Sequence, residues 1–241
     1  MQPYVIVHGA FHGAEVWSAV KSRLERAGHP AIAVTLPGRP GNPLPANQVT
    51  LEAYRDCVLS AVNAMAAPVV LVGHSFGGMT ISNVAEVAPG RIRTLAYVAA
   101  YLPLSGQNAR ELSAEDADSA WSDRNFLIAA DRSTAHVLNE DCVRLFGADL
   151  EPDWQRRLRE LLVPEPLLPI RTPVYLTPQR FGGVDKVFIR TSHDNTISPR
   201  MQDRMLGRVA VRAVHTIRSS HFPHLSRPDD LTELLLSCPP A

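Results

Sequence analysis

The sequence contains very little lysine and no long apolar run. Lys21 and Lys186 are its only lysines, so arginine supplies nearly all of the 24 positive charges, which balance 24 acidic residues. Because no basic run and no basic stripe with interleaved aromatic residues occurs, we expect no nucleic-acid partner. No apolar segment approaches the roughly 20 residues of a membrane-spanning helix. We therefore expect no membrane insertion either.

Cysteine is also scarce, with Cys57, Cys142 and Cys238 far apart and odd in number. Their spacing matches no metal site, so we favour reduced, mostly buried thiols over a disulfide. The first apolar segment, Tyr4–Val7, is typical of a buried strand and not of a secretory leader. Together these features predict a cytoplasmic protein.

The length and apolar content predict one domain with a sizeable core, since the chain has 241 residues and is 45% hydrophobic. Most of its short apolar runs are continuous rather than alternating with polar residues. This pattern indicates strands buried on both faces, as in a parallel sheet covered by helices. The strand candidates are Tyr4–Val7, Ala31–Thr35, Val69–Val72, Thr94–Val98, Lys186–Arg190 and Val211–Ile217.

Helical patterns fall between these strand candidates. Apolar residues recur at helical spacing in each segment, and Ser or Thr often precedes the first turn. Strand and helix alternation of this kind predicts a doubly wound α/β sheet. The expected helices cover Val16–Leu24, a segment from Thr50 to Met65, a segment from Ser75 to about Pro89, and starts at Ser198-Pro199 and Ser226–Pro228.

The alternation stops between Pro103 and Gly183. These residues, about 80 in number, are too many for a plain connection. We expect helices at Asn139–Phe146, ended by Gly147, and around Trp154–Leu162. The sequence therefore predicts a mostly helical cap at residues 104–181, inserted into a core formed by residues 1–103 and 182–241.

The segment Gly73–Gly77, Gly-His-Ser-Phe-Gly, has the G-x-S-x-G pattern of a nucleophile elbow. A strand pattern precedes it and a helical pattern follows, so Ser75 is expected at a sharp turn with its hydroxyl exposed. The start of the following helix directs backbone N–H groups at a developing oxyanion. We predict Ser75 as the nucleophile and the Phe76 N–H group as one oxyanion donor.

The segment His8–Gly13 directly follows the first strand candidate. In this position we expect the second oxyanion donor, which we assign to the backbone N–H group of Ala10. The spacing of His8 and His12 is compatible with a metal site on a helix. Because glycines between them break any helix, we favour hydrogen bonds that brace the loop.

Asp194 follows the strand candidate Val187–Arg190 and belongs to the loop at its carboxyl end. Sheets of this type place their sites at that edge, so Asp194 is the candidate acid that orients a histidine. His193 is expected on the surface. Asp185 precedes the strand and is expected at the opposite edge of the sheet.

Two histidines, His221 and His224, follow the last strand candidate and compete for the role of base. His221 comes first, and we favour it, while His224 is expected to cap or brace the following helix. The resulting order, Ser75, Asp194 and His221, is the order that α/β-hydrolases use for their triad.

These motifs together resemble one branch of the α/β-hydrolases, namely plant methylesterases, plant hydroxynitrile lyases and bacterial esterase relatives. The resemblance extends over nearly the whole chain and implies a six-stranded sheet. Its most specific part is Arg180–Val184, because a generic hydrolase does not need that segment. The motifs are His8–Ala14, Gly73–Gly78, Arg180–Val184 and His221–Pro228.

Two positions separate the chain from the lyases of this branch. The lyases carry a threonine where this sequence has Gly9, and a lysine where it has Phe222. The resemblance therefore implies the esterase side of the branch. The cap is less similar, so the family's substrates do not transfer to this chain.

The sequence thus predicts a serine hydrolase that cleaves a small or medium carboxylic ester through an acyl-enzyme, with no metal or organic cofactor. Its partner is a small-molecule ester, and the protein is expected to be a monomer or a homodimer. Two alternatives stay open, a lyase that uses the same triad and a non-catalytic ligand-binding relative. The cap aromatics are expected either in the pocket wall or in the core of the cap. The expected pocket residues are Gly9, Phe11, Trp121, Phe126 and Phe222.

Overall fold

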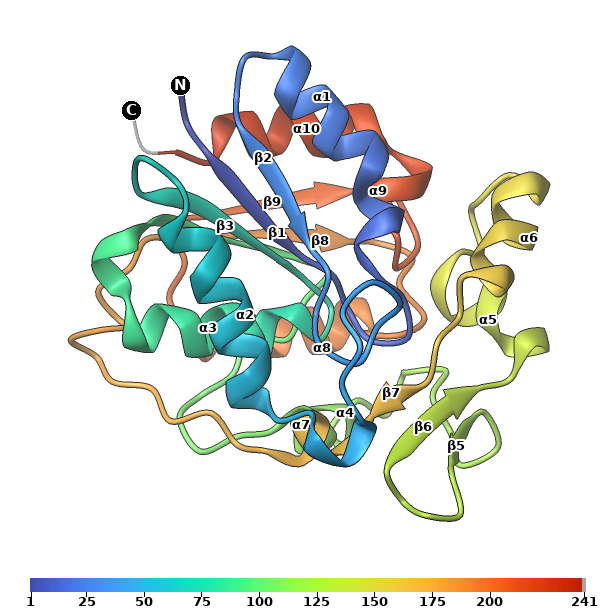
Figure 1. Ribbon diagram of the computed structural model, residues 1–241. Coiled ribbons are helices and arrows are strands. Elements are labelled where there is room, and N and C mark those ends of the chain that lie inside the picture. The colour runs from blue at the N-terminus through green and yellow to red at the C-terminus, as the bar shows by residue number, and fades with distance from the viewer. Residues whose placement is uncertain (240–241) are drawn as a thin grey trace.

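A computed structural model describes residues 1–239 of the chain (Figure 1). Its central sheet has six strands in the order β2-β1-β3-β4-β8-β9. All neighbouring strands of this sheet pair in parallel, which confirms the predicted doubly wound architecture. The strands are β1 Tyr4–Val7, β2 Ala31–Val34, β3 Val69–His74, β4 Ile92–Val98, β8 Lys186–Thr191 and β9 Ala213–Ile217.

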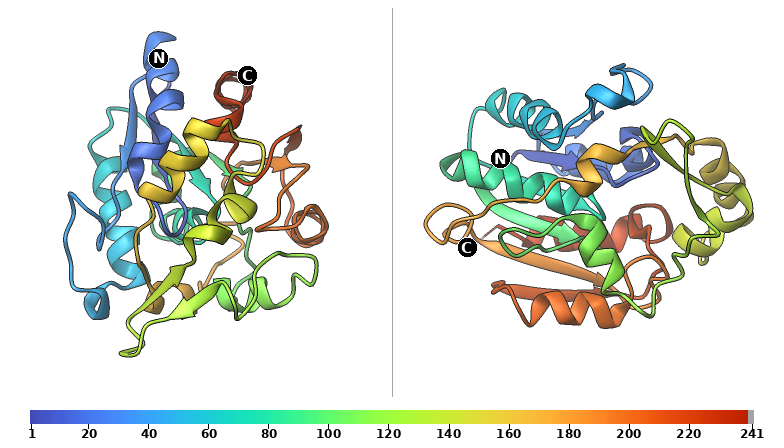
Figure 2. Two further views of the ribbon diagram at one scale, coloured as in Figure 1. Left: turned by 90° about the vertical axis from the view of Figure 1, so that its right-hand side faces the viewer. Right: turned by 90° about the horizontal axis from the view of Figure 1, so that it is seen from below.

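Helices cover both faces of the sheet, and a separate apolar core lies under each set (Figures 1 and 2). The helices α1 and α10 lie together on one face, while α2, α3 and α8 cover the other. Since every residue of β3 is buried between these layers, its sequence shows no polar alternation. These helices are α1 Ser18–Arg26, α2 Leu51–Asn63, α3 Gly77–Val87, α8 Pro199–Leu206 and α10 Pro228–Ser237, with short turns η1 Ala14–Trp17, η2 Ala46–Gln48, η3 Pro89–Arg91 and α9 Pro223–Ser226.

The helix starts follow the polar residues seen in the sequence. The Thr50 hydroxyl accepts a hydrogen bond from the Ala53 N–H at 3.0 Å, and the Ser198 hydroxyl accepts one from the Met201 N–H at 3.1 Å. These caps satisfy N–H groups that the first turn leaves without a partner. The predicted helix through Met65 is two residues too long, since α2 ends at Asn63.

Residues 99–185, here called the inserted segment, leave the sheet after β4 and return at its neighbour β8. The helix α5 has the predicted bounds, and α6 begins two residues before Trp154. A three-stranded antiparallel sheet, β5-β6-β7, was not predicted and lies in this segment together with its helices. Its elements are α4 Ala109–Ala114, β5 Phe126–Ile128, β6 Thr134–Val137, α5 Asn139–Phe146, α6 Pro152–Glu160, β7 Glu165–Pro166 and α7 Leu167–Arg171.

In Figure 1, β5, β6, α5 and α6 of the inserted segment lie at the right, on the side toward which the arrowheads of β8 and β9 point, while α4 and α7 lie below the sheet. Parallel strands bring their carboxyl ends to one edge, so the loops after β1, β3, β8 and β9 meet there. Between residues 1 and 239, no helix is long and apolar enough to cross a membrane. The three cysteines are free thiols, and burial raises the pKa of Cys142 and Cys238 to about 12.

Candidate active site

Ser75 lies at the turn between β3 and α3, with a left-handed backbone φ of 53°. Residues other than glycine rarely adopt this conformation, and strain of this kind persists only where neighbouring contacts hold it. Here the Ser75 N–H donates to the Val98 carbonyl at 3.3 Å, and the Ser75 carbonyl accepts from the Tyr101 N–H at 3.1 Å. Both ends of the residue are therefore fixed by the strand next to β3 and the segment that follows it.

The glycines after Ser75 allow the start of α3 to approach the sheet closely. A Cβ atom at Gly77 would lie 2.7 Å from the Val7 carbonyl oxygen, and one at Gly78 would lie 2.1 Å from the Tyr101 carbonyl oxygen. No side chain fits at either position without a shift of backbone. Both glycines are thus required by packing.

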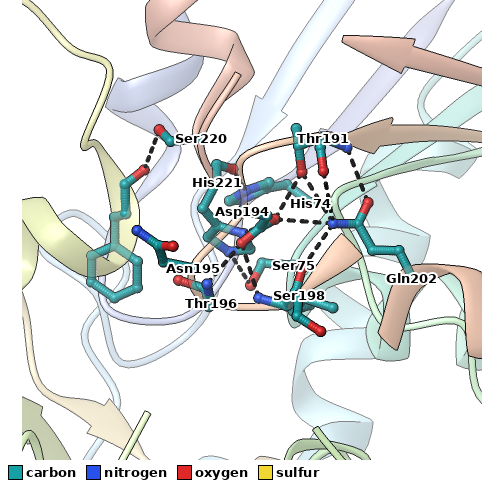
Figure 3. Close-up of polar contacts among 12 residues, drawn as sticks. His74, Ser75, Thr191, Asp194, Asn195, Thr196, Ser198, Gln202, Ser220 and His221 are labelled. Atoms are coloured by element: carbon teal, nitrogen blue, oxygen red, sulfur yellow. Dashed lines mark hydrogen bonds and ion pairs between the residues drawn. The ribbon is translucent and has the colours of Figure 1, made fainter. Parts of the chain in front are cut away.

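Ser75, His221 and Asp194 form a continuous chain of hydrogen bonds (Figure 3). His221 Nε2 lies 2.9 Å from Ser75 Oγ, and His221 Nδ1 lies 2.8 Å from Asp194 Oδ2. A carboxylate only accepts hydrogen bonds, so Nδ1 carries the proton and Nε2 is free to accept from the serine hydroxyl. The three residues come from the loops after β3, β8 and β9, and all are buried.

The Asp194 carboxylate is fixed by several donors besides His221. One oxygen accepts from the Thr196 and Ile197 N–H groups at 2.8 and 2.9 Å. The other oxygen accepts from the Thr191 hydroxyl at 2.8 Å and from the Gln202 amide at 3.4 Å. Donors of this kind stabilise the ionised form of a buried carboxyl group.

Sequence reasoning missed Thr191 and Gln202 as parts of this network. The buried Gln202 side chain on α8 also accepts from the Thr191 N–H at 3.0 Å and donates to the Ile197 carbonyl at 2.8 Å. A glutamine on a helix resembles any surface residue in the sequence. Only the tertiary contact between α8 and β8 gives it this role.

The backbone of His221 is held by a second buried histidine. His74 Nε2 donates to the His221 carbonyl at 2.9 Å (Figure 3). Burial, together with the neighbouring His224 and His221, lowers the pKa of His74 well below its usual value. His74 is therefore a neutral donor that holds the loop carrying His221.

The competing residue, His224, makes no hydrogen bond to Ser75. Its ring is buried and stacks on Trp17 at 4.3 Å, and neither ring nitrogen has a hydrogen-bond partner in the described part of the chain. His224 therefore does not cap the following helix, and it braces this region through ring contacts with Trp17, His74 and Phe222. The other candidates are placed as expected, with His193 exposed and Asp185 at the start of β8, where it accepts from Thr94.

His8 and His12 brace the loop after β1. His8 Nδ1 donates to the Gly9 carbonyl at 2.8 Å, its Nε2 accepts from the Leu36 N–H at 3.2 Å, and His12 Nε2 donates to the Leu158 carbonyl at 3.2 Å. Burial lowers the pKa of His8 to about 3 and that of His12 to about 4. Both rings are thus neutral hydrogen-bonding groups. Within residues 1–239, no cluster of three or more His, Cys, Asp or Glu side chains is suited to bind a metal.

Ser75 and His221 face a cavity of about 420 Å³ between the sheet edge and the inserted segment. Phe11, Trp121, Phe126 and Phe222 line it, so these aromatics of the inserted segment and the loops belong to the pocket wall. Gly9 does not line the cavity. It packs behind the serine, where an added Cβ would lie 2.8 Å from Ser75 Cβ.

Other lining residues were not predicted, because they lie in parts of the chain that carry no motif. Phe146 at the end of α5 packs against Phe11, with ring centroids 6.2 Å apart. Further lining residues not predicted include Tyr101, Ser113, Ile128, Leu167, Ile170 and Thr196, with Arg110, Asp123 and Arg171 as charged members.

The backbone N–H groups of Ala10 and Phe76 are available to a ligand. Both residues line the cavity, and in the described part of the chain neither N–H group donates a hydrogen bond. Ala10 is half-buried and Phe76 is buried, and most backbone N–H groups inside proteins are paired. Two unpaired ones at the same cavity as Ser75 are suited to bind an oxygen atom.

Comparison with known proteins gives the family. The profile of the Alpha/beta hydrolase family matches residues 4–234, and the chain belongs to that family. It is 28% identical to Putative methylesterase 12, chloroplastic, of Arabidopsis thaliana over 248 residues, covering 98% of this chain and 71% of the relative. Methylesterase 7 of the same plant is also 28% identical, over 246 residues that cover 97% of this chain and 94% of the relative.

A solved structure extends the comparison to three dimensions. Polyneuridine aldehyde esterase has a TM-score of 0.88 at 22% sequence identity, with 98% of each chain covered. This similarity concerns the fold. The resemblance to the plant methylesterase branch, inferred from the motifs, is confirmed by the sequence relatives.

Proposed function

We propose that the protein is a serine esterase that cleaves a small or medium carboxylic ester through an acyl-enzyme intermediate. The observation that carries the proposal is the hydrogen-bond chain from Ser75 through His221 to Asp194, which ends at an apolar cavity. The methylesterase names of the sequence relatives support it.

In the first step, Ser75 Oγ attacks the carbonyl carbon of the ester while His221 Nε2 takes the hydroxyl proton. Asp194 keeps Nδ1 protonated and stabilises the imidazolium that forms. The N–H groups of Ala10 and Phe76 bind the oxyanion of the tetrahedral intermediate. One such donor contributes about 3–4 kcal/mol in comparable sites.

In the second step, His221 returns the proton to the leaving alcohol, and the acyl group stays on Ser75. Water enters, and His221 takes a proton from it as it attacks the acyl carbonyl. The acid product then leaves, and Ser75 recovers its proton from His221.

We also propose that the protein is located in the cytoplasm and is a monomer or a homodimer.

The lyase alternative lacks a structural basis in this chain. The lyases of the branch have a threonine at the position of Gly9, where even a Cβ atom would lie 2.8 Å from Ser75 Cβ and 3.0 Å from His74 Nδ1. Phe222, at the position of the lyase lysine, packs between the rings of His74 and Phe146 at 5.0 and 5.4 Å. An apolar ring at that position offers no charge to a cyanide leaving group.

The test is hydrolysis of p-nitrophenyl esters from acetate to octanoate. Ser75→Ala is expected to lower kcat by at least about 10³-fold, since the nucleophile is lost. Ser113→Ala is the matched control, because Ser113 lines the same cavity outside the triad and should leave kcat near the original value. Ordinary turnover in Ser75→Ala would overturn the mechanism. A chain that neither turns over any ester nor reacts with a serine-directed phosphonate would support a non-catalytic binding protein.

A further inference from the structure

A buried charged cluster joins the inserted segment to the loop that carries Ala10. Its members are Glu165 on β7, Arg39 in the loop after β2, and Tyr54 on α2. Glu165 and Arg39 form an ion pair, with side chains 0% and 1% exposed. The Tyr54 hydroxyl donates to the other Glu165 oxygen at 3.1 Å. Burying charges is unfavourable unless they are paired, and here the ion pair and the Tyr54 hydroxyl supply partners for both Glu165 oxygens.

The cluster holds the backbone of Phe11, the residue after Ala10. Glu165 accepts a hydrogen bond from the Phe11 N–H at 2.8 Å. The Phe11 carbonyl accepts from the Val163 N–H at 2.8 Å, so the inserted segment binds both sides of this residue. Arg39 adds a third contact, because its Nε donates to the carbonyl of His12 at 3.1 Å.

Phe11 needs such support, because its backbone φ is 65°. A bulky residue with positive φ is strained, and strain of this kind costs about 1–3 kcal/mol unless the surroundings enforce it. Phe11 is one of four non-glycine residues with positive φ in the described part of the chain, and Ser75 is another. The two strained residues therefore flank the two candidate oxyanion donors, Ala10 and Phe76.

The cluster also reaches the second donor. The ring of Tyr54 packs edge-on against the ring of Phe76, with centroids 6.2 Å apart. Tyr54 thus connects the carboxylate that fixes Phe11 with the residue that follows Ser75. No other charged side chain of the described residues contacts the backbone of Phe11.

We propose that Glu165 is a positioning residue of the esterase, which sets the Ala10 N–H group for the oxyanion by holding the left-handed backbone of Phe11. The inference rests on the proposed function and deepens it. The carboxylate comes from β7 of the inserted segment, so this segment also holds the loop that carries Ala10. Glu165 does not touch the substrate, because it lies behind the loop and is not a lining residue of the cavity.

The test compares Glu165→Gln and Tyr54→Phe with Glu160→Gln, whose glutamate is exposed at the end of α6. Active sites are first counted by the stoichiometric release of p-nitrophenol from a p-nitrophenyl phosphonate, so that unfolded protein does not affect kcat. Glu165→Gln is expected to lower kcat per titrated site about 10–100-fold, which is less than the loss of a whole donor. Tyr54→Phe is expected to lower it about 3–10-fold, since only one of the hydrogen bonds to Glu165 is lost. KM should stay within about twofold, because the effect belongs to the transition state.

A second readout separates positioning from stability. A trifluoromethyl ketone forms a tetrahedral adduct with an oxyanion, whereas the carboxylic acid product does not. The inhibition constant of the ketone should rise in proportion to the loss of kcat/KM, and that of the acid should stay unchanged. Glu160→Gln should alter neither constant.

The outcomes are distinguishable from a failure of the proposed function. If the unaltered protein hydrolyses no ester, the proposed function fails. If it does, the inference is overturned when both cluster variants keep the original kcat per titrated site, or when they weaken the ketone and the acid equally. If Glu165→Gln does not fold, the test rests on Tyr54→Phe. An unchanged inhibition constant of the trifluoromethyl ketone in that variant overturns the inference.

Discussion

The cavity has two walls, one at the sheet edge and one formed by the inserted segment. Different kinds of contact hold the side chains of the two walls. Ser75, Asp194 and His221 each follow a strand of the central sheet within a few residues, and hydrogen bonds with backbone and side-chain groups fix them. Trp121 precedes β5, and Phe126 begins that short strand; both pack mainly against other aromatic rings. The chemistry thus depends on polar geometry, whereas the shape of the pocket depends on apolar packing. Substitutions at the first wall should change kcat, and substitutions at the second should change the choice of ester.

After the loss of Ser75 itself, the largest effect is expected at Asp194. In Asp194→Asn, an amide NH2 group replaces one carboxylate oxygen among donors from Thr191, Thr196 and Ile197. His221 then loses the acceptor that fixes its tautomer, and kcat should fall about 10⁴-fold, as in other triads. The measurement is kcat on the best p-nitrophenyl ester.

Asp185→Asn is the matched control for this substitution. Asp185 lies at the start of β8 and pairs with Arg212 at 2.9 Å, remote from the triad. Its loss should leave kcat within about twofold, because an exposed ion pair contributes little. A loss in Asp194→Asn of less than about tenfold would contradict the role assigned to the carboxylate.

A smaller loss is expected at Gly9, which packs against Ser75 and His74. The added methyl group of Gly9→Ala would lie 2.8 Å from Ser75 Cβ and 3.0 Å from His74 Nδ1, so the serine or the loop must move. A displacement of about 1 Å in an active site can lower the rate about 10²-fold, and kcat/KM should fall by that order. Gly90→Ala is the control, since a Cβ there meets nothing within 4 Å. Equal kcat/KM values in the two variants would show that the loop accommodates the added methyl group without loss of catalysis.

The core of the site was predictable because it follows local rules. The Gly73–Gly77 motif requires a strand before it and a helix after it, and both were visible as apolar patterns. The order of Ser75, Asp194 and His221 then followed from the ends of successive strands. Thr191 and Gln202 were not predictable, because their contacts with Asp194 depend on how α8 packs beside β8.

The inserted segment was less predictable for a related reason. The strands β5, β6 and β7 are short, and β7 contains a proline. The sequence therefore has no run of alternating polar and apolar residues that would predict them. Glu165 and Arg39 are 126 positions apart in the sequence. A buried pair of this kind reads as two ordinary charged residues until the fold brings them together. The boundaries of the cap at residues 104–181 stay a prediction.

The pocket wall gives a prediction about specificity. Trp121 packs against Phe11 and Phe126, with ring centroids 5.7 and 5.6 Å apart, and lines the cavity. Trp121→Ala should enlarge the acyl pocket and raise the ratio of kcat/KM for octanoate to that for acetate about tenfold. Competition between the two esters measures this ratio directly.

Trp154→Ala provides the comparison within the inserted segment. Trp154 packs under Arg157, whose guanidinium lies 5.1 Å from the ring centroid, and it is not a lining residue. Its loss should leave the ratio near the original value. If both tryptophan variants shifted the ratio equally, the effect would come from loosening of the inserted segment and not from the shape of the cavity.

The two histidines near the nucleophile allow the last comparison, which concerns stability and not rate. His221 has a partner for each ring nitrogen, whereas His224 has none among the described residues. Burial, followed by the charges of His221 and His12, lowers the pKa of His224 well below its usual value. The folded state keeps the ring neutral, while the unfolded chain binds a proton once the pH falls below about 6.5.

Stability conferred by the neutral His224 is therefore present above about pH 6.5 and decreases as the pH falls, by at most about 1.4 kcal/mol per pH unit. His224→Phe keeps an aromatic ring on Trp17 and removes the titration. The free energy of unfolding of this variant, measured with urea, should fall less steeply between about pH 6.5 and pH 5 than that of the original protein. The control is His136→Phe, because His136 is exposed on β6 and should leave the slope unchanged. Equal slopes in all three proteins would mean that His8, His12 and His74, which are also buried with lowered pKa values, account for the acid sensitivity without His224.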